Sequence, residues 1–207
     1  MKTFASCLLL GLIVVTTAMS QSFNLQQLLK EKNLVLYEHY VPIPLKEKEG
    51  ISCNRLVWLK DINFSTGTIE VDLRGKDIPQ RSFLGVAFHG VDTVTYDAIY
   101  FRPFNFQSTD PVRKIHAVQY ISHPEFTWEK LRNEKNGIYE KGISPAPAAT
   151  DWFHVKIVVD ESSITVYVNG ATMHSLKVNK LNDRKDGLIG LWNYGLEGDF
   201  ANLSIKK

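Results

Sequence analysis

The chain has 207 residues, with 24 lysines and arginines against 22 aspartates and glutamates, so its formal net charge is only +2 at pH 7. The basic residues are scattered along the chain, which argues against nucleic acid as a partner, because that binding depends on clustered positive charge. The length suits a single domain with a sizeable hydrophobic core.

The first 20 residues have the pattern of a secretory signal peptide. Lys2 is the only early charge, an apolar run follows at residues 8–15, and the small residues Ala18 and Ser20 stand where a signal peptidase cleaves. The apolar run is too short for a transmembrane helix, which needs about 20 such residues. We therefore expect cleavage near Ser20, no membrane insertion, and a secreted or periplasmic (extracytoplasmic) protein made of residues 21–207.

The start of the mature chain, residues 24–33, predicts one short amphipathic helix. Asn24 is a suitable N-cap, and Gln27 follows it three residues later, as in a capping box. Leu25 and Leu28 lie on one face of this helix, which indicates that it packs on the rest of the domain.

Nearly all of the remaining chain follows a period of two, which is typical of half-buried strands. Residues 153–159 and 164–169 alternate between apolar and other side chains, and the pair Asn169 and Gly170 favours a tight hairpin turn. Residues 188–192 are apolar on both faces, as expected of a central strand. The pattern predicts an all-β protein, an antiparallel β-sandwich with one short N-terminal helix.

The middle of the chain, residues 110–150, is less regular. It contains four prolines around one expected helical turn at residues 128–133. We interpret it as an elaborated insertion that packs on the sandwich, within one domain that extends over residues 21–207. Binding residues tend to lie in such loops, because a rigid scaffold holds them in place.

Several segments together resemble one superfamily. The segments are residues 64–72, 83–88, 151–159, 164–170, 187–192 and 198–205. They resemble the concanavalin A-like lectin/glucanase superfamily, and within it laminin-G-like domains and secreted domains related to the 3-keto-disaccharide hydrolases. The resemblance covers roughly residues 34–205. It implies a jelly roll of two curved antiparallel sheets, whose concave face commonly holds a glycan.

Side chains suited to a sugar gather between residues 96 and 132. Aromatic rings stack on the apolar faces of sugars, while amide and guanidinium groups bind the hydroxyls. The ligand-binding candidates are Tyr100, Arg102, Asn105, His116, Gln119, Tyr120 and Trp128. Strand alternation places Tyr100 and Arg102 on one face but separates Gln119 from His116, so regular strands would not bring all seven together. For each aromatic ring taken singly, packing in the core is the commoner role.

The segment from Glu70 to Arg74 partly resembles the glucanase signature, in which three acids occupy alternate residues of one strand. A retaining mechanism needs two carboxyl groups about 5–5.5 Å apart. Arg74 stands where the third acid would be, and its charge opposes the raised pKa that a general acid requires. We therefore expect an ordinary polar strand face here, and no catalytic residue is assigned.

The sequence favours a secreted, lectin-like domain that binds a glycan or polysaccharide without catalysis. Two alternatives stay open: a glycoside-cleaving enzyme of the 3-keto-disaccharide hydrolase type, with His116 or Glu125 as the base, and a laminin-G-like module with a protein partner. The sequence does not decide whether the chain is an enzyme. We expect no cofactor and assign no metal ligand, although the resemblance to laminin-G-like domains and legume lectins leaves calcium open.

Overall fold

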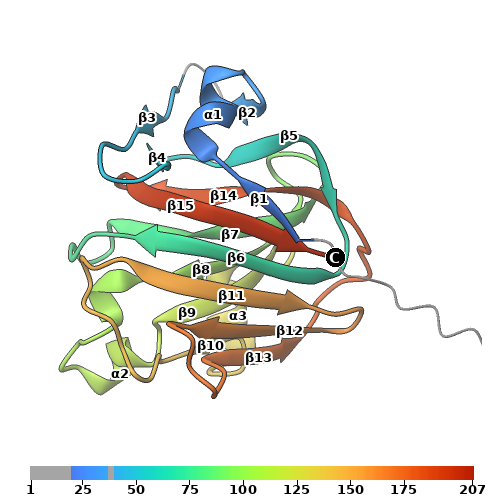
Figure 1. The fold of residues 1–207 in the computed structure, drawn as a ribbon. Helices are drawn as coiled ribbons and strands as arrows, with labels where there is room; N and C mark the ends of the chain where they lie inside the picture. Colours follow the sequence, from blue (N-terminus) through green and yellow to red (C-terminus); the bar gives the residue numbers. More distant parts are fainter. Residues whose placement is uncertain (1–19, 37–39) are drawn as a thin grey trace, which may run out of the picture.

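The computed structural model describes residues 20–36 and 40–207, and its strands form two antiparallel sheets packed face to face (Figure 1). In Figure 1 the strands β15, β6, β11 and β12 lie in front, and β7, β8 and β9 lie behind them. The prediction of an all-β antiparallel sandwich is confirmed. The predicted signal peptide falls almost entirely outside the described residues, so its cleavage near Ser20 stays a prediction.

The first sheet has eight strands in the order β13-β12-β11-β6-β15-β4-β3, with β1 paired to β15. The bounds are β1 (Ser20–Phe23), β3 (Ile43–Pro44), β4 (Ile51–Cys53), β6 (Gly67–Arg74), β11 (Phe153–Val159), β12 (Ser163–Val168), β13 (Leu176–Asn179) and β15 (Gly198–Lys206). Asn169 and Gly170 reverse the chain after β12 with φ of 52° and 67°. The paired residues closest to this reversal are Val166 and Leu176, so the connection is longer than the tight hairpin that we predicted.

The second sheet has seven strands in the order β10-β9-β8-β7-β14-β5-β2. The bounds are β2 (Leu34–Leu36), β5 (Val57–Phe64), β7 (Ser82–Gly90), β8 (Tyr96–Phe101), β9 (Val118–His123), β10 (Glu140–Lys141) and β14 (Gly187–Gly195). Strand β14 lies between β7 and β5, so the apolar residues 188–192 do belong to a central strand.

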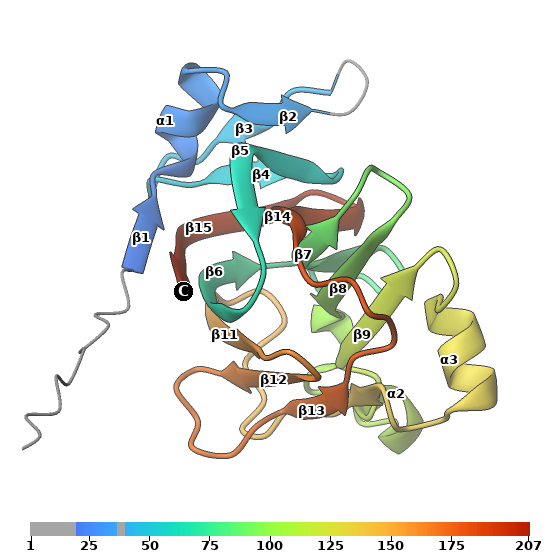
Figure 2. The same cartoon turned by 90° about the vertical axis from the view of Figure 1, so that its right-hand side faces the viewer.

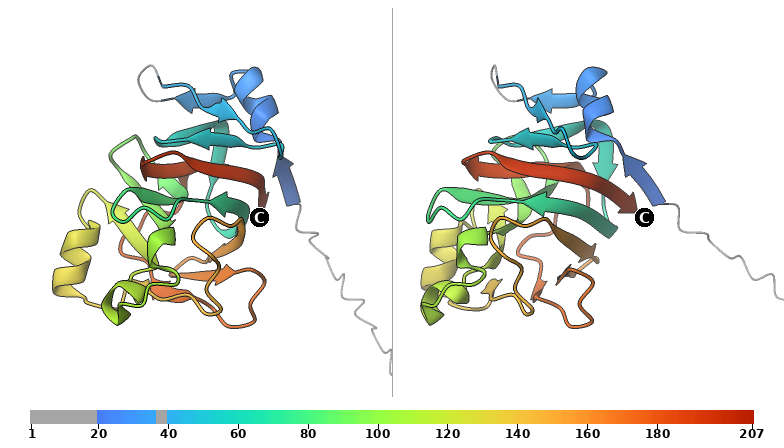
Figure 3. Two further views of the ribbon diagram at one scale, coloured as in Figure 1. Left: turned by 90° about the vertical axis from the view of Figure 1, so that its left-hand side faces the viewer. Right: turned by 60° about the vertical axis from the view of Figure 1, so that its left-hand side comes forward.

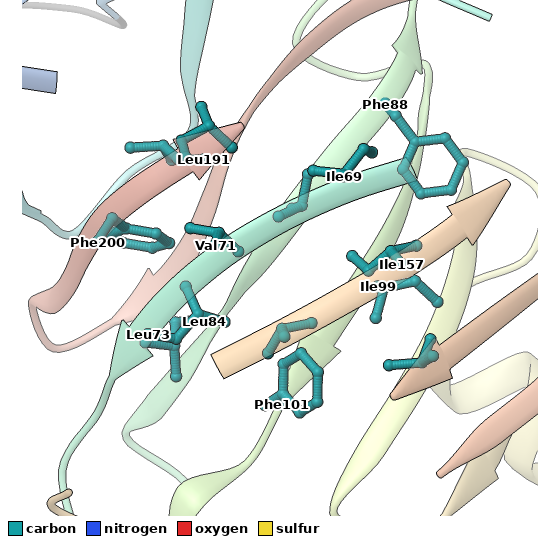
Figure 4. Packing of buried hydrophobic residues seen from close by; sticks show 14 of the residues in the cluster. Ile69, Val71, Leu73, Leu84, Phe88, Ile99, Phe101, Ile157, Leu191 and Phe200 are labelled. Carbon is teal, nitrogen blue, oxygen red and sulfur yellow. The ribbon is translucent and has the colours of Figure 1, made fainter. Parts of the chain in front are cut away.

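The main hydrophobic core fills the space between the two sheets (Figure 4). Ile69, Val71 and Leu73 of β6 point into it and are fully buried. They meet side chains of the opposite sheet, among them Phe88 and Phe101. Because side chains alternate along a strand, the intervening polar residues of β6 point away from the core.

The N-terminal helix α1 (Leu25–Lys30) forms as predicted. The Asn24 side chain caps it by accepting a hydrogen bond from the backbone N–H of Gln27 at 3.0 Å. Leu25 is fully buried against the core, which fixes the helix on the sandwich.

Three short helices follow β8: η1 (Pro103–Asn105), α2 (Pro111–Lys114) and α3 (Trp128–Glu134). Figures 2 and 3 place α3 on the side of β9 that faces away from β11 and β12. The expected helical turn at residues 128–133 is thus present. The segment 110–150 also contains β9, which pairs with β8 over six residues, in the region where we applied strand alternation to residues 116–120. It builds a wall on the outer face of the seven-stranded sheet.

Candidate functional site

A cavity of about 840 Å³ lies on the outer face of the seven-stranded sheet, beside the helical segment. Its volume falls in the range of about 300–1,000 Å³ that is usual for small-molecule sites. Central strands form its floor, through Phe83 of β7, Tyr96 and Tyr100 of β8, and Trp192 and Tyr194 of β14. These residues occupy the positions whose neighbours along each strand point into the core, so strand alternation directs their rings outward.

The floor is a continuous group of aromatic rings. The rings of Tyr100 and Trp192 lie 4.7 Å apart between centroids, and Phe83 lies 6.3 Å from Tyr100 and 6.0 Å from Tyr194. The indole N–H of Trp192 donates a hydrogen bond of 3.1 Å to the Tyr96 hydroxyl, which fixes both side chains. The floor is therefore apolar and rigid.

The wall comes from the segment between β8 and β10. It contributes Arg102, Phe104, Asn105, Arg113, His116, Trp128 and Arg132 to the cavity. The side chain of Thr127 caps α3 and so positions Trp128 at the rim, where 46% of the residue is exposed. The Arg132 guanidinium lies over the Trp128 ring, 5.1 Å from its centroid, and holds the ring in place.

Arg102 is buried at the base of this wall, with only 5% of the residue exposed. Its Nη2 donates to the Tyr100 hydroxyl and to Gln119 Oε1, and its Nη1 donates to the backbone carbonyl of His116 at 3.2 Å. Burial lowers the pKa of Arg102 and raises the pKa of Tyr100 to about 12. The network fixes a cation beside the aromatic floor.

The charge partner of this wall is Glu140, which is 2% exposed. It accepts hydrogen bonds from Arg132 Nε and Nη2 at 2.9 and 2.7 Å, and its Oε2 lies 3.5 Å from Arg102 Nη1. His116 Nδ1 lies 2.8 Å from Oε2, although no aligned hydrogen bond joins them. Burial favours the neutral acid, but Arg132, His116 and Arg102 outweigh it and lower the pKa of Glu140.

The structure brings most of the candidate binding residues together. Five of them line the cavity: Tyr100, Arg102, Asn105, His116 and Trp128. Gln119 lies directly beneath it, fully buried, where its Oε1 joins Tyr100 to Arg102. Tyr120 does not reach the cavity, because alternation turns it into the main core, where its hydroxyl donates to Asp97 at 3.0 Å.

The expected separation of His116 from Gln119 is absent for a simple reason. His116 precedes the first residue of β9, so the alternation of that strand does not govern it, and its side chain turns toward the cavity. Gln119 pairs with Tyr100 across β8 and β9 and therefore lies on the cavity side of the sheet. Glu125, the alternative base, is exposed and does not line the cavity. Its Oε1 lies 3.7 Å from Lys130 Nζ.

Sequence reasoning missed several lining or supporting residues, among them Phe83, Arg113, Glu140, Trp192 and Tyr194. For Trp192 and Tyr194 a signal existed, because they occupy alternate positions that continue an apolar strand. For Glu140 the only signal was indirect. A buried Arg102 needs a counter-charge, but the sequence does not say which acid supplies it.

The acidic motif on β6 lies on the outer face of the other sheet, away from the cavity. Asp72 accepts hydrogen bonds from Lys48, His154 and Asn202 at 2.7–2.9 Å. Partial burial favours its neutral form, but these bonds outweigh burial and lower the pKa of Asp72. Arg74 pairs with Asp199 at 2.8 Å. The motif thus forms a polar network on the outer face of this sheet.

Within residues 20–36 and 40–207, no three histidine, cysteine, aspartate or glutamate side chains are grouped to hold a metal ion. No helix in the same part of the chain is both long and apolar enough to cross a membrane. Cys53 is fully buried in β4, and this burial raises the pKa of its thiol.

Several solved structures share this fold. The carbohydrate-binding module CBM66 from Bacillus subtilis has a TM-score of 0.59 and 13% identity, over 84% of this chain and 95% of that one. A galectin-like protein of unknown function from Bacillus subtilis has a TM-score of 0.60 and 11% identity, over 92% and 96%. A protein from Parabacteroides distasonis, for which a glycosyl hydrolase activity has been proposed, has a TM-score of 0.50 and 12% identity, over 78% of this chain and 82% of that one.

These identities are low, so the likeness establishes the fold alone, a lectin-like jelly-roll sandwich. A comparison with curated protein sequences gives no match. The family model of the 3-keto-alpha-glucoside-1,2-lyase-like domain matches residues 45–206, which include every strand from β4 to β15. The chain therefore belongs to the 3-keto-alpha-glucoside-1,2-lyase-like domain family.

Proposed function

We propose that this chain is an exported carbohydrate-binding domain whose cavity holds a glycan. The observation that carries the proposal is the combination of an aromatic floor with fixed polar groups in one cavity of about 840 Å³. Sugar rings present apolar C–H faces that stack on aromatic rings and hydroxyls that bind polar groups at their edges. The floor offers the first kind of contact, and the wall offers the second.

The polar part of the cavity is organised before a ligand arrives. Tyr100, Arg102 and Asn105 are almost fully buried, and hydrogen bonds to Gln119 and to the backbone of His116 hold them. Groups that are already fixed lose little conformational entropy on binding, which favours affinity. Trp128 and Tyr194 stand at the rim with exposed rings, where a bound sugar would contact them first.

Two further points support a glycan as ligand. A carbohydrate-binding module is among the solved structures with the same fold. The family to which the chain belongs is described by an activity on a glucoside.

The test is isothermal titration of a broad glycan panel into the protein and into Trp128→Ala. Removal of a stacking ring should weaken binding at least about fivefold, since an aromatic contact is worth roughly 1 kcal/mol beyond its buried area. The matched control is Trp152→Ala, because Trp152 lies beside Lys48 and Arg74 near the outer face of the other sheet. No binding across the panel would overturn the proposal, and so would equal effects of the two substitutions.

A second candidate function, elimination of a 3-keto-glucoside, is favoured by the position of His116. In such a reaction a base removes the proton at C2, beside the ketone, the C1–O bond breaks, and the departing oxygen gains a proton. Burial lowers the pKa of His116, so its ring is neutral near pH 7 and can accept a proton. A proton on Nδ1, beside Glu140, leaves the lone pair of Nε2 free to act as the base.

This candidate is tested by incubating the protein with a 3-keto-glucoside and following the conjugated product by ultraviolet absorbance. His116→Ala should lower the turnover rate at least about a hundredfold, which is typical for loss of a general base. His174→Ala is the matched control, because His174 is exposed between β12 and β13 and does not line the cavity. Absence of turnover in the unmodified protein would reject the enzyme and leave the binding proposal intact.

A further inference from the structure

The charged side chains that line the cavity are all basic. They are Arg102, Arg113 and Arg132. No carboxylate is among the lining residues, and the nearest acid in the network, Glu140, lies behind them and is 2% exposed. Three guanidinium groups therefore face one carboxylate, and the cavity carries an excess of positive charge.

The amide and carboxylate oxygens of the cavity wall, on Asn105, Gln119 and Glu140, are already engaged as hydrogen-bond acceptors. Asn105 Oδ1 accepts from Arg113 Nε at 3.3 Å, and Gln119 Oε1 accepts from both Tyr100 and Arg102. Both carboxylate oxygens of Glu140 accept from Arg132. A neutral sugar hydroxyl needs an acceptor as well as a donor, whereas a carboxylate needs donors only. The cavity suits the second kind of ligand better.

Arg113 supplies two donors on one guanidinium group. Its Nε is held by Asn105, while its terminal Nη1 and Nη2 have no hydrogen-bond or ion-pair partner among the residues that the structure describes. The residue lies on α2, whose N-terminal end is capped by Asp110, so its backbone is fixed at the cavity wall. A planar guanidinium binds a planar carboxylate through two parallel hydrogen bonds.

We propose that the cavity selects an acidic glycan, and that Arg113 binds the carboxylate of a uronic acid unit whose ring lies on the aromatic floor. Arg102 and Arg132 add to the positive field but are held mainly by Glu140 and Gln119. This inference rests on the proposed function, because it names the class of sugar that the same cavity binds.

The experiment compares three ligands by isothermal titration: a galacturonic acid trisaccharide, the same trisaccharide after reduction of its carboxyl groups, and a sulfated oligosaccharide of similar length. The uronate should bind at least tenfold more tightly than its reduced form. Raising the salt concentration from 50 to 500 mM should weaken the binding of the uronate and leave that of the reduced form unchanged, because salt screens charge. Arg113→Gln should abolish the preference for the uronate.

The matched control is Arg55→Gln, since Arg55 is exposed between β4 and β5 and does not line the cavity. It should keep the preference, and circular dichroism shows whether each variant is folded. Equal affinity for the uronate and its reduced form, or tighter binding of the reduced form, would overturn this inference while supporting a carbohydrate-binding domain. Tighter binding of the sulfated ligand would also overturn it. If none of the three ligands binds but another glycan of the panel does, this inference is overturned and the proposed function stands. If no glycan of the panel binds either, the proposed function itself is overturned.

Discussion

At the scale of single residues, Asp97 is the most heavily bonded acid of the described chain outside the cavity. It is fully buried and accepts hydrogen bonds from Tyr120, Asn182 and Arg184 at 2.6–3.0 Å, and His89 Nδ1 lies 3.2 Å away. Burial alone would raise its pKa, but His89, Arg184 and the hydroxyl groups outweigh burial and lower the pKa of Asp97. The network joins β8 to the segment before β14.

Asp97→Ala should lower the free energy of unfolding by about 3 kcal/mol, because it removes a fully buried carboxylate and leaves the partly buried Arg184 guanidinium and the buried Tyr120 hydroxyl without their partner. Urea denaturation measures the loss. The control is Asp151→Ala at an exposed position, which should change stability by no more than about 0.5 kcal/mol. Similar losses for the two variants would contradict the role given to Asp97.

The same carboxylate predicts how stability depends on pH. The native pKa of Asp97 is below its unfolded value of about 3.9, so its contribution is fully present above that pH and is lost as the pH falls through the native pKa. The stability difference between the unmodified protein and Asp97→Asn should therefore be constant from about pH 7 to pH 5 and shrink below about pH 4. A difference that stays constant down to pH 3 would contradict this prediction.

Some of these contacts could be anticipated from the sequence and others could not. The sequence indicates that Arg102 must find a partner, since a charge between Phe101 and Phe104 cannot stay buried alone. It does not identify Glu140, because that pairing depends on the register of a two-residue strand, β10, against β9. No local pattern of two residues specifies such a register.

At the scale of elements, the long alternating segments were predictable and the short ones were not. Strands β6, β11 and β12 alternate over six to eight residues, and helix α1 has its N-cap in the sequence. Strands β3 and β10 have two residues each and carry no periodic signal. The wall of the cavity is built from such short elements, so its layout came only from the structure.

The reversal after β12 gives a test at this scale. Gly170 has a φ of +67°, and a Cβ added there would meet no atom within 4 Å, so the cost of a side chain is one of backbone conformation alone. Gly170→Ala should lower the free energy of unfolding by about 1 kcal/mol. Gly170→Asn should cost clearly less, because asparagine tolerates this conformation. Equal losses in urea denaturation would show that the left-handed conformation is not the cause.

At the scale of the whole molecule, one core joins the two sheets. Phe153 of β11 packs against Phe101 of β8 and Phe106 after η1, with ring centroids 5.3 and 5.1 Å away. These contacts run from the eight-stranded sheet across the sandwich to the base of the helical wall. The two sheets and the wall should therefore unfold together.

Phe153→Ala tests this cooperativity. Loss of a buried phenylalanine costs about 3–5 kcal/mol, which in a domain of this size lowers Tm by about 10 °C. Near- and far-ultraviolet circular dichroism should still report one coincident transition. Met173→Ala, at a residue that is 77% exposed, should leave Tm nearly unchanged. Two separate transitions in either variant would show that the wall unfolds independently of the sandwich.

The cavity divides its lining between two kinds of structure: the floor belongs to central strands of the sandwich, and the wall belongs to one continuous stretch from Arg102 to Arg132. The wall residues that distinguish one ligand from another and the strand residues that stabilise the sandwich are thus largely different residues. A mutant library confined to wall positions such as Arg113 and Trp128 would change the choice of sugar and spare the strands that keep the domain folded. For the same reason, substitutions in the wall can accumulate during evolution without loss of the sandwich fold.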